Sequence, residues 1–256
     1  MKYLKNVKEH FDNVSSTYSS NYQGDNIVFH SFDTRLKIVL ELIQNPANKT
    51  ILDIGCGPGP LAKELVQYPC EFIGIDIAPG MIEQCKKNKE LEKFQFYSVD
   101  PVDYLQENKD KKFDIITCMG LFEYLSDDYT EKLMVAITDR LSDNGILIAT
   151  FPNYWSPYRV IDRFYRKITG SESMVPPYTP GVQHKEFKKS ETKNKWGDYG
   201  IRLNDSVYYN FRLIPKPFDK MFKSIDLWIA RCLQKLSRSP LRFLATAMVL
   251  KGVKNV

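Results

Sequence analysis

Hydrophobic and polar residues alternate along this chain in blocks that have the lengths of strands and amphipathic helices. Short, almost continuous apolar runs are typical of buried parallel strands. They occupy residues 50–54, 71–75, 94–99, 113–118 and 145–151. Between them, apolar residues recur at helical spacing over about 33–45, 60–68, 80–90 and 128–141. This pattern predicts an α/β fold, in which helices cover both faces of a parallel sheet.

The alternation is interrupted between residues 152 and 187, a stretch rich in proline, tyrosine, tryptophan and arginine. Regular elements are then expected at 188–198 (helix), 206–211 (strand), 218–237 (helix) and 242–250 (strand). We therefore divide the chain into four parts. They are an N-terminal segment (1–32), a core (33–151), an insertion (152–187) and a C-terminal completion of the core sheet (188–256).

The loop that follows the first predicted strand is the most informative motif. Asp53 ends the strand, and Gly55, Gly57 and Gly59 follow at alternate positions before a helical pattern begins. Glycine permits positive φ and lets a ligand approach bare backbone. A strand, a tight loop and a helix N-terminus present backbone amides to a nucleotide-like ligand. The dinucleotide fingerprint G-x-G-x-x-G does not fit, because Pro60 stands where its third glycine belongs.

Two further acids end the second and third strands. Asp76 is in position to accept hydrogen bonds from both hydroxyls of a ribose. Asp100 is in position to contact the edge of an adenine. Each acid alone is also typical of a helix cap or a solvated turn. Three acid-terminated strands behind a D-x-G-x-G-x-G loop favour a nucleotide-binding site.

These motifs resemble those of the class I S-adenosylmethionine-dependent methyltransferases, over roughly residues 11–151. The resemblance implies a Rossmann-like, doubly wound sheet of seven mostly parallel strands with an antiparallel last strand. It also implies an acceptor-binding insertion after strand 5. The donor would be S-adenosyl-L-methionine, the product S-adenosyl-L-homocysteine, and no metal is expected.

The resemblance also assigns the donor-binding residues. Residues 11–18 are similar to the F-D-x-x-A-x-x-Y opening of quinone-biosynthesis-type methyltransferases, with Ser15 in place of the alanine. The N-terminal segment would then close over the cofactor. The expected donor-binding residues are Tyr18, Asp53, Gly55, Cys56, Gly57, Gly59, Asp76, Ile77, Met81, Asp100, Pro101 and Met119.

The insertion is expected to form the acceptor side. Residues 155–168 carry an apolar stripe at helical spacing opposite several arginines. We expect this helix to pack on the core as a lid with its cations solvated. An apolar acceptor pocket and a docking surface for a lipid or an anionic head group are the open alternatives. Tyr154, Phe164 and Tyr165 are the acceptor-binding candidates.

Methyl transfer from a sulfonium needs no covalent intermediate, so alignment of the acceptor is the main task of the protein. A hydroxyl or a protonated amine would also need a base. His184 is a candidate because it titrates near neutrality and lies in the insertion. Glu123 is a second candidate because it follows the fourth strand. The ordinary alternatives are a surface histidine and an exposed acid.

Charge and composition limit the remaining choices. Residues 154–206 hold ten Lys/Arg and six Asp/Glu, which indicates an anionic acceptor or a solvated basic face. The five cysteines include no C-x-x-C pair, which argues against a structural zinc site. There is no signal-like N-terminus and no apolar run near the roughly 20 residues of a membrane span. We expect a cytoplasmic protein, with peripheral membrane contact left open.

The sequence therefore predicts methyl transfer by in-line displacement to an oxygen or nitrogen, with carbon left open, of a small, partly apolar and anionic molecule. A nucleic-acid partner is not expected, because no Asn/Asp-Pro-Pro-Tyr-like run follows the fourth strand and no basic stripe carries interleaved aromatics. An RNA or protein methyltransferase and a non-catalytic S-adenosylmethionine-binding module are the alternatives. Monomer and homodimer stay open.

Overall fold

The computed structural model describes residues 2–170, 184–214 and 221–255, which build one seven-stranded sheet. The strands are β1 (Thr50–Ile54), β2 (Glu71–Asp76), β3 (Gln95–Ser98), β4 (Phe113–Cys118), β5 (Leu141–Pro152), β6 (Ile201–Phe211) and β7 (Ala245–Lys254). Their order across the sheet is β3-β2-β1-β4-β5-β7-β6. Neighbours from β3 to β5 pair in parallel, whereas β7 pairs antiparallel with both β5 and β6. The predicted fold class is confirmed.

Helices precede and follow the strands in the predicted rhythm. The α-helices are α1 (Lys2–Tyr18), α2 (Ile27–Ile43), α3 (Pro60–Leu65), α4 (Pro79–Lys87), α5 (Pro101–Glu107), α6 (Asp127–Arg140), α7 (Pro157–Thr169), α8 (Lys189–Asp198) and α9 (Lys223–Leu233). Short 3-10 helices are η1 (Ser19–Tyr22), η2 (Lys89–Leu91), η3 (Phe122–Tyr124), η5 (Gln234–Leu236) and η6 (Pro240–Leu244). Proline begins several of the α-helices, where its missing N–H costs nothing.

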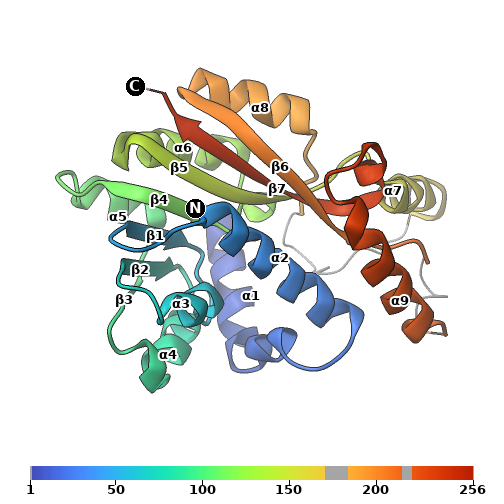
Figure 1. The fold of residues 1–256 in the computed structure, drawn as a ribbon, viewed down its shortest axis with the longest axis horizontal. Helices are drawn as coiled ribbons and strands as arrows, with labels where there is room; N and C mark the ends of the chain where they lie inside the picture. Colours follow the sequence, from blue (N-terminus) through green and yellow to red (C-terminus); the bar gives the residue numbers. More distant parts are fainter. Residues whose placement is uncertain (1, 171–183, 215–220, 256) are drawn as a thin grey trace.

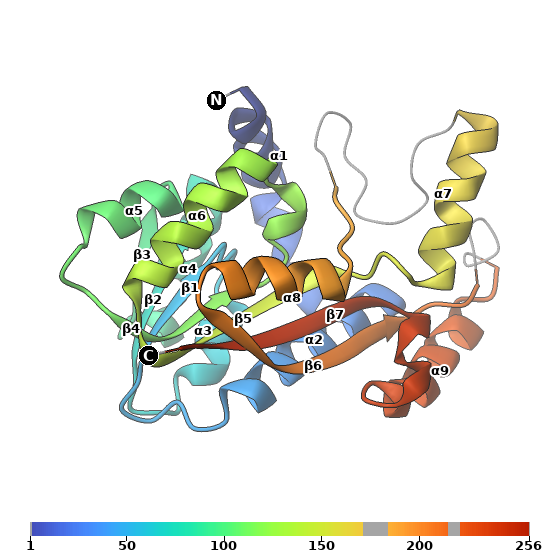
Figure 2. The same ribbon diagram turned by 90° about the horizontal axis from the view of Figure 1, so that it is seen from above.

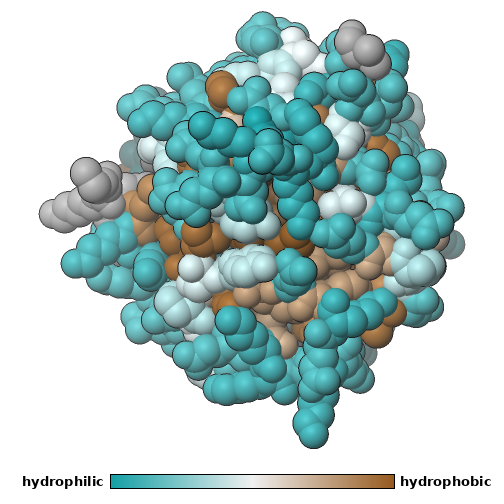
Figure 3. Space-filling view, turned by 90° about the vertical axis from the view of Figure 1, so that its left-hand side faces the viewer, coloured by the Kyte–Doolittle hydropathy of each residue, from teal (hydrophilic) through white to brown (hydrophobic). Residues whose placement is uncertain are grey.

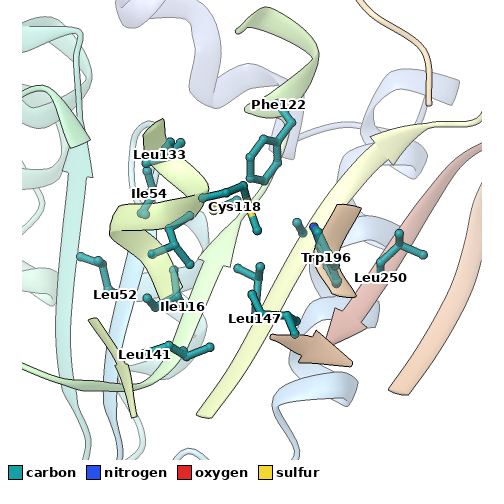
Figure 4. Close-up of a cluster of buried hydrophobic side chains, with 14 of the residues drawn as sticks. Leu52, Ile54, Ile116, Cys118, Phe122, Leu133, Leu141, Leu147, Trp196 and Leu250 are labelled. Atoms are coloured by element: carbon teal, nitrogen blue, oxygen red, sulfur yellow. The ribbon is translucent and has the colours of Figure 1, made fainter. Parts of the chain in front are cut away.

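Helices cover both faces of the sheet, as the continuous apolar strands require. In Figure 1, α6 and α8 lie above the sheet, and α2, α3 and α4 lie below it. The core under α6 and α8 includes Leu52, Ile116, Leu133 and Trp196, which point toward one another in Figure 4. The second core packs the stripe of α2 against the other side of the same strands. The central strands β1 and β4 are thus buried on both sides, whereas β3 at the edge of the sheet exposes most of its residues.

The last strands differ from their predicted bounds for local reasons. β6 begins at Ile201 rather than 206, and its pairing register shifts between Leu203 and Asp205. Polar residues occupy this irregular part of the strand, and in the sequence they have the pattern of a loop. β7 begins at Ala245 rather than 242, because η6 occupies residues 240–244 after Pro240. The predicted helix at 218–237 is represented by α9 and η5, and residues 215–220 lie outside the described ranges.

The prediction that the apolar stripe of the insertion helix packs on the core is wrong. Phe164 and Ile168 of α7 are 65% and 68% exposed. The opposite face is buried, because Arg159 Nε donates to the carbonyl of Thr246 at 2.9 Å and Asp162 Oδ2 pairs with Arg166 Nε at 3.1 Å. The helix therefore attaches to the protein through its charged side.

Among the helices that the structure describes, none is long and apolar enough to cross a membrane.

Candidate functional site

A pocket opens at the carboxyl ends of β1, β2 and β4, under α1. About 680 Å³ of its space is not filled by atoms, a volume that includes its open mouth. Helix α1, the glycine loop, the end of β2 and the segment after β4 form its walls. The lining residues are Leu4, Val7, Phe11, Tyr18, Gly55, Gly57, Ile75, Asp76, Ile77, Met81, Pro101, Met119, Gly120, Leu121, Tyr124, Leu125 and Tyr129.

The glycine loop faces this pocket through its first two glycines. Gly55 and Gly57 have φ of 73° and 53°, a backbone conformation that side chains disfavour. A first side-chain carbon at Gly57 would stand 3.8 Å from Tyr18 Cε1, so the bare loop lies opposite α1. Gly59 does not line the pocket. It begins α3, and a carbon there would stand 3.0 Å from Leu91 Cδ1, so close packing behind the loop requires this glycine.

Asp76 links the loop to the end of β2. Its Oδ2 accepts a hydrogen bond from the Gly57 N–H at 3.0 Å, and its Oδ1 accepts one from the Ala78 N–H at 2.9 Å. Burial raises the pKa of this carboxyl, against the lowering effect of the backbone hydrogen bonds. A carboxylate oxygen can accept more than one hydrogen bond, so both oxygens keep capacity for ribose hydroxyls.

Asp53 lies fully buried at the end of β1, outside the pocket wall. Its Oδ1 accepts the Thr117 hydroxyl at 2.6 Å, and its Oδ2 has no hydrogen-bond partner among the described residues. Burial raises the pKa of this carboxyl to about 7. A buried acceptor without a partner is costly, and a bound ammonium would satisfy it.

Asp100 is the N-cap of α5. Its Oδ1 accepts from the Val102 N–H at 2.9 Å and from the Tyr129 hydroxyl at 2.7 Å. Pro101 and Tyr129, its neighbours in sequence and in space, line the pocket, whereas Asp100 itself does not. The capping role is visible in the structure, and the predicted adenine contact stays a prediction.

The structure brings most of the predicted donor-binding residues together. Those that line the pocket are Tyr18, Gly55, Gly57, Asp76, Ile77, Met81, Pro101 and Met119. Asp53, Cys56, Gly59 and Asp100 lie behind this wall. The Cys56 thiol is buried, which raises its pKa well above the ordinary value, so it packs as a small apolar group.

Helix α1 covers the pocket and is held by the motif at residues 11–18. Asp12 Oδ1 accepts the Gly80 N–H of α4 at 2.7 Å. A Cβ atom placed on Gly80 would lie 2.4 Å from Ser15 Oγ, so the close contact of α1 with α4 depends on the missing side chain of Gly80 and the small side chain of Ser15. The Phe11 ring meets the Tyr124 ring edge-on at 5.2 Å. The motif therefore places Tyr18 over the glycine loop. The sequence did not predict that Leu4 and Val7 also line the pocket.

A buried cation and a buried acid meet beside the pocket at Gly120. A first side-chain carbon at Gly120 would stand 2.9 Å from Arg35 Nη1 and 3.6 Å from Glu123 Oε1. Arg35 of α2 is 9% exposed, donates from Nη2 to the Tyr22 hydroxyl at 2.9 Å, and lies over the Phe32 ring. Its Nε has no hydrogen-bond partner among the described residues. This glycine thus leaves room where two charged groups converge.

Glu123 is buried rather than exposed. Its Oε2 has no hydrogen-bond partner among the described residues, and burial raises the pKa of the carboxyl to about 7. Sequence analysis identified Glu123 but missed Arg35. The sequence shows two cations, Arg35 and Lys37, beside the apolar stripe of the helix expected at 33–45, and such cations are typical of a solvated helix face.

His184 packs near Glu123, because the Lys185 N–H donates to the Glu123 carbonyl at 2.9 Å. Its ring meets the Tyr124 ring edge-on at 5.6 Å. Burial, and secondarily the charge of Arg159, lower the pKa of His184 to about 4. The imidazole is therefore half-buried and neutral at neutral pH, not a fully solvated loop histidine.

The three acceptor-binding candidates do not line this pocket. The Tyr154 ring lies under the guanidinium of Arg163 at 3.9 Å, on the inner side of α7. Phe164 and Tyr165 are exposed on its outer side. Residues 171–183 of the predicted lid lie outside the described ranges. Within those ranges, no three His, Cys, Asp or Glu side chains are grouped so as to hold a metal ion.

Comparison with known proteins matches the core of the chain to a methyltransferase family. Residues 51–145 match the model of a methyltransferase domain. A ubiquinone biosynthesis O-methyltransferase of Coxiella burnetii is 24% identical over 72% of this chain and 76% of that protein. An uncharacterized protein of Haemophilus influenzae is 34% identical over 43% of this chain and 44% of its own length.

Solved structures share the whole fold. The magnesium protoporphyrin IX methyltransferase of Synechocystis PCC 6803, with bound S-adenosylhomocysteine, superposes with a TM-score of 0.66 at 15% identity. The superposition covers 98% of this chain and 99% of that one. A SAM-dependent methyltransferase of Archaeoglobus fulgidus gives 0.62 at 20% identity, over 93% and 98% of the two chains.

The ordered motifs, the sheet topology and the matched domain agree on one family. The bare glycine loop and the acid at the end of β2 suit the amino-acid and ribose portions of its methyl donor. The chain therefore carries a methyltransferase domain over residues 51–145 and has the fold of the class I S-adenosylmethionine-dependent methyltransferases.

Proposed function

We propose that this enzyme transfers a methyl group by in-line displacement to an oxygen or nitrogen of a small, partly apolar and anionic molecule. The observation that carries this proposal is the convergence of Arg35 and Glu123 on Gly120, beside the donor pocket. The similar proteins named for ubiquinone biosynthesis and for magnesium protoporphyrin IX support a small acceptor.

The donor supplies an activated methyl group on sulfur, so the protein has to hold two partners in line. Gly55 and Gly57 would accommodate the amino-acid portion of the donor, and Asp76 the ribose hydroxyls. The open oxygen of Asp53 would face the ammonium, and Asp100 would contact the adenine through the same wall. Alignment of this kind lowers barriers by up to roughly 7 to 11 kcal/mol.

Arg35 would bind the anionic group of the acceptor. Among the described residues, no carboxylate oxygen lies within 4.0 Å of its guanidinium, although the side chain is buried. A buried arginine gains most from a bidentate anion, and an acceptor carboxylate offers that pairing. The apolar lining on the α1 side would accommodate the rest of the molecule.

Glu123 would accept the proton that the acceptor oxygen or nitrogen loses as the new bond to the methyl carbon forms. A base works best with a pKa near the working pH, which favours Glu123, near 7, over His184, near 4. His184 would then form part of the acceptor wall. The described parts of the insertion, residues 152–170 and 184–187, would border this side of the site, as a lid requires.

The test is transfer from methyl-labelled S-adenosylmethionine into a cell extract that has been separated into small-molecule and macromolecular fractions. The proposal predicts label in the small-molecule fraction, loss of labelling with Glu123→Gln, and retention of donor binding by that variant. Label in RNA or protein would identify the alternative acceptor class. Donor binding without any transfer would point to a non-catalytic module.

A further inference from the structure

Large hydrophobic side chains gather at the end of the molecule formed by α7, α9 and η6. We call this surface the apolar end. Its exposed members are Trp155, Val160, Ile161, Phe164, Tyr165, Ile168, Met221, Phe222, Ile225, Trp228, Leu241 and Phe243. Helices α7 and α9 lie at the same end of the molecule in both ribbon views (Figures 1 and 2). Figure 3 shows the opposite end, where hydrophilic side chains surround a band of hydrophobic ones.

The exposure follows from how the two helices attach to the protein. Each turns a charged residue inward, Asp162 in α7 and Asp226 in α9, at 0% and 1% exposure. Asp162 pairs with Arg166, and Asp226 Oδ2 lies 3.6 Å from Arg212 Nη2. The apolar stripes are therefore left on the outside. Exposed apolar stripes of this kind, on two helices at one end of the molecule, mark an interaction site in a soluble protein.

The exposed charged side chains of α7, α9 and η6 themselves are cationic, although Arg231 of α9 pairs with Asp25 from outside these elements. Asp162 and Asp226 are the only acids within residues 155–170 and 221–243, and both are buried. Exposed cations, Lys167 and Lys223 among them, accompany the apolar side chains. An interfacial helix combines an apolar face, aromatic side chains and flanking cations in this way. The complementary surface is a bilayer that carries anionic head groups.

We propose that the apolar end docks on an anionic lipid bilayer, with α7 and α9 lying in the head-group region. The Trp155 and Trp228 rings would sit at the boundary between acyl chains and head groups. Lys167 and Lys223 would lie against lipid phosphates. This inference does not depend on the identity of the acceptor, because it rests on a surface away from the residues that line the donor pocket.

The test is co-sedimentation of the full chain with vesicles of phosphatidylcholine alone or mixed with phosphatidylglycerol. We expect binding to the mixed vesicles that weakens as salt is raised. The double variant Phe164→Ser, Ile168→Ser should lower the bound fraction at least fivefold, and Trp228→Ser should lower it in the same direction. Val135→Ser, which alters a 51% exposed valine on α6, is the matched control and should bind as the unaltered protein does.

A second pair of variants tests the charge. Lys167→Glu with Lys223→Glu should abolish the preference for anionic vesicles, whereas Lys132→Glu on α6 should leave it unchanged. Donor binding, measured on every variant, reports that the fold is intact. Equal sedimentation of the α7 variants and the Val135→Ser control would overturn the proposal. So would a dimer in solution that the α7 variants convert to monomers, because a second copy would then occupy the surface.

Discussion

At the scale of single residues, the glycine loop leaves the pocket open because Gly55 and Gly57 have no side chains to fill it. Gly57 has positive φ, and a Cβ atom placed on it would lie 3.8 Å from Tyr18 Cε1. Gly57→Val should therefore abolish donor binding by occupying the space between loop and helix. Gly200→Val is the matched control, because Gly200 also has positive φ but faces open space. Calorimetry should find binding lost only in the first variant, and equal loss in both would mean that strain alone is responsible.

The buried acids predict how stability depends on pH. Burial raises the pKa of Asp53 and of Glu123 to about 7, well above the ordinary values of these carboxyl groups. The folded chain therefore binds more protons than the unfolded chain between about pH 4 and pH 7, so the free energy of unfolding should fall as pH rises through this window. Asp53→Asn should make the decline shallower in denaturant titrations at several pH values. An unchanged slope would show that Asp53 titrates normally.

Asp53 should also link donor binding to pH. A donor ammonium favours the charged carboxylate, so binding of S-adenosylmethionine should release a proton and tighten as pH rises toward about 7. Asp53→Asn should weaken this dependence, whereas Glu123→Gln, which alters an acid of raised pKa outside the pocket lining, should keep it. Calorimetry in buffers of different ionisation enthalpy counts the released protons. Identical proton release in both variants would remove Asp53 from the donor site.

At the scale of elements, the contact of α1 with α4 decides whether the pocket is covered. Gly80→Ala would place a carbon 2.4 Å from Ser15 Oγ and should push α1 off the pocket. We expect weaker donor binding at a melting temperature close to that of the unaltered protein, because the contact lies outside both cores. Adding Ser15→Gly should restore binding. Gly197→Ala, at a helical glycine with open space around it, is the control.

Failure of the Ser15→Gly rescue would contradict this account of α1.

The contact of α1 with α4 also explains why residue 15 is small. The spacing of the F-D-x-x-S-x-x-Y motif places Asp12 and Ser15 against Gly80, and it places Tyr18 over Gly57. Serine therefore replaces alanine without loss of fit. The sequence motif is a packing motif as well as a binding one.

At the scale of the whole molecule, local pattern was enough to predict the sheet and to name eight residues that line one pocket. The strands at whose ends Asp53 and Asp76 lie were visible as apolar runs, since burial on both faces removes polar positions. Which side of α7 meets the protein was not visible. An amphipathic pattern shows two faces, but only the partners of Arg159 and Asp162 decide which one is buried.

The acceptor side was predicted less completely for a related reason. Arg35 and Glu123 are 88 residues apart in the sequence, and they meet only because α2 and the segment after β4 converge at Gly120. No periodicity reports such a meeting. Glycine-rich loops and strand-ending acids have local signatures, whereas a buried pair from distant elements has none.

The central claim, that the pocket binds S-adenosylmethionine through its glycine loop and Asp76, is tested most directly by the donor affinity of Asp76→Ala. The acid would make two charge-assisted hydrogen bonds to the ribose, so its loss should cost on the order of 2 to 4 kcal/mol, at least tenfold in Kd. Asp114→Ala is the matched control, because Asp114 also accepts a backbone N–H, from Thr50 at 2.9 Å, but lies outside the pocket. Calorimetry should show weakened binding for Asp76→Ala alone. Unchanged affinity in a folded Asp76→Ala protein would contradict the account.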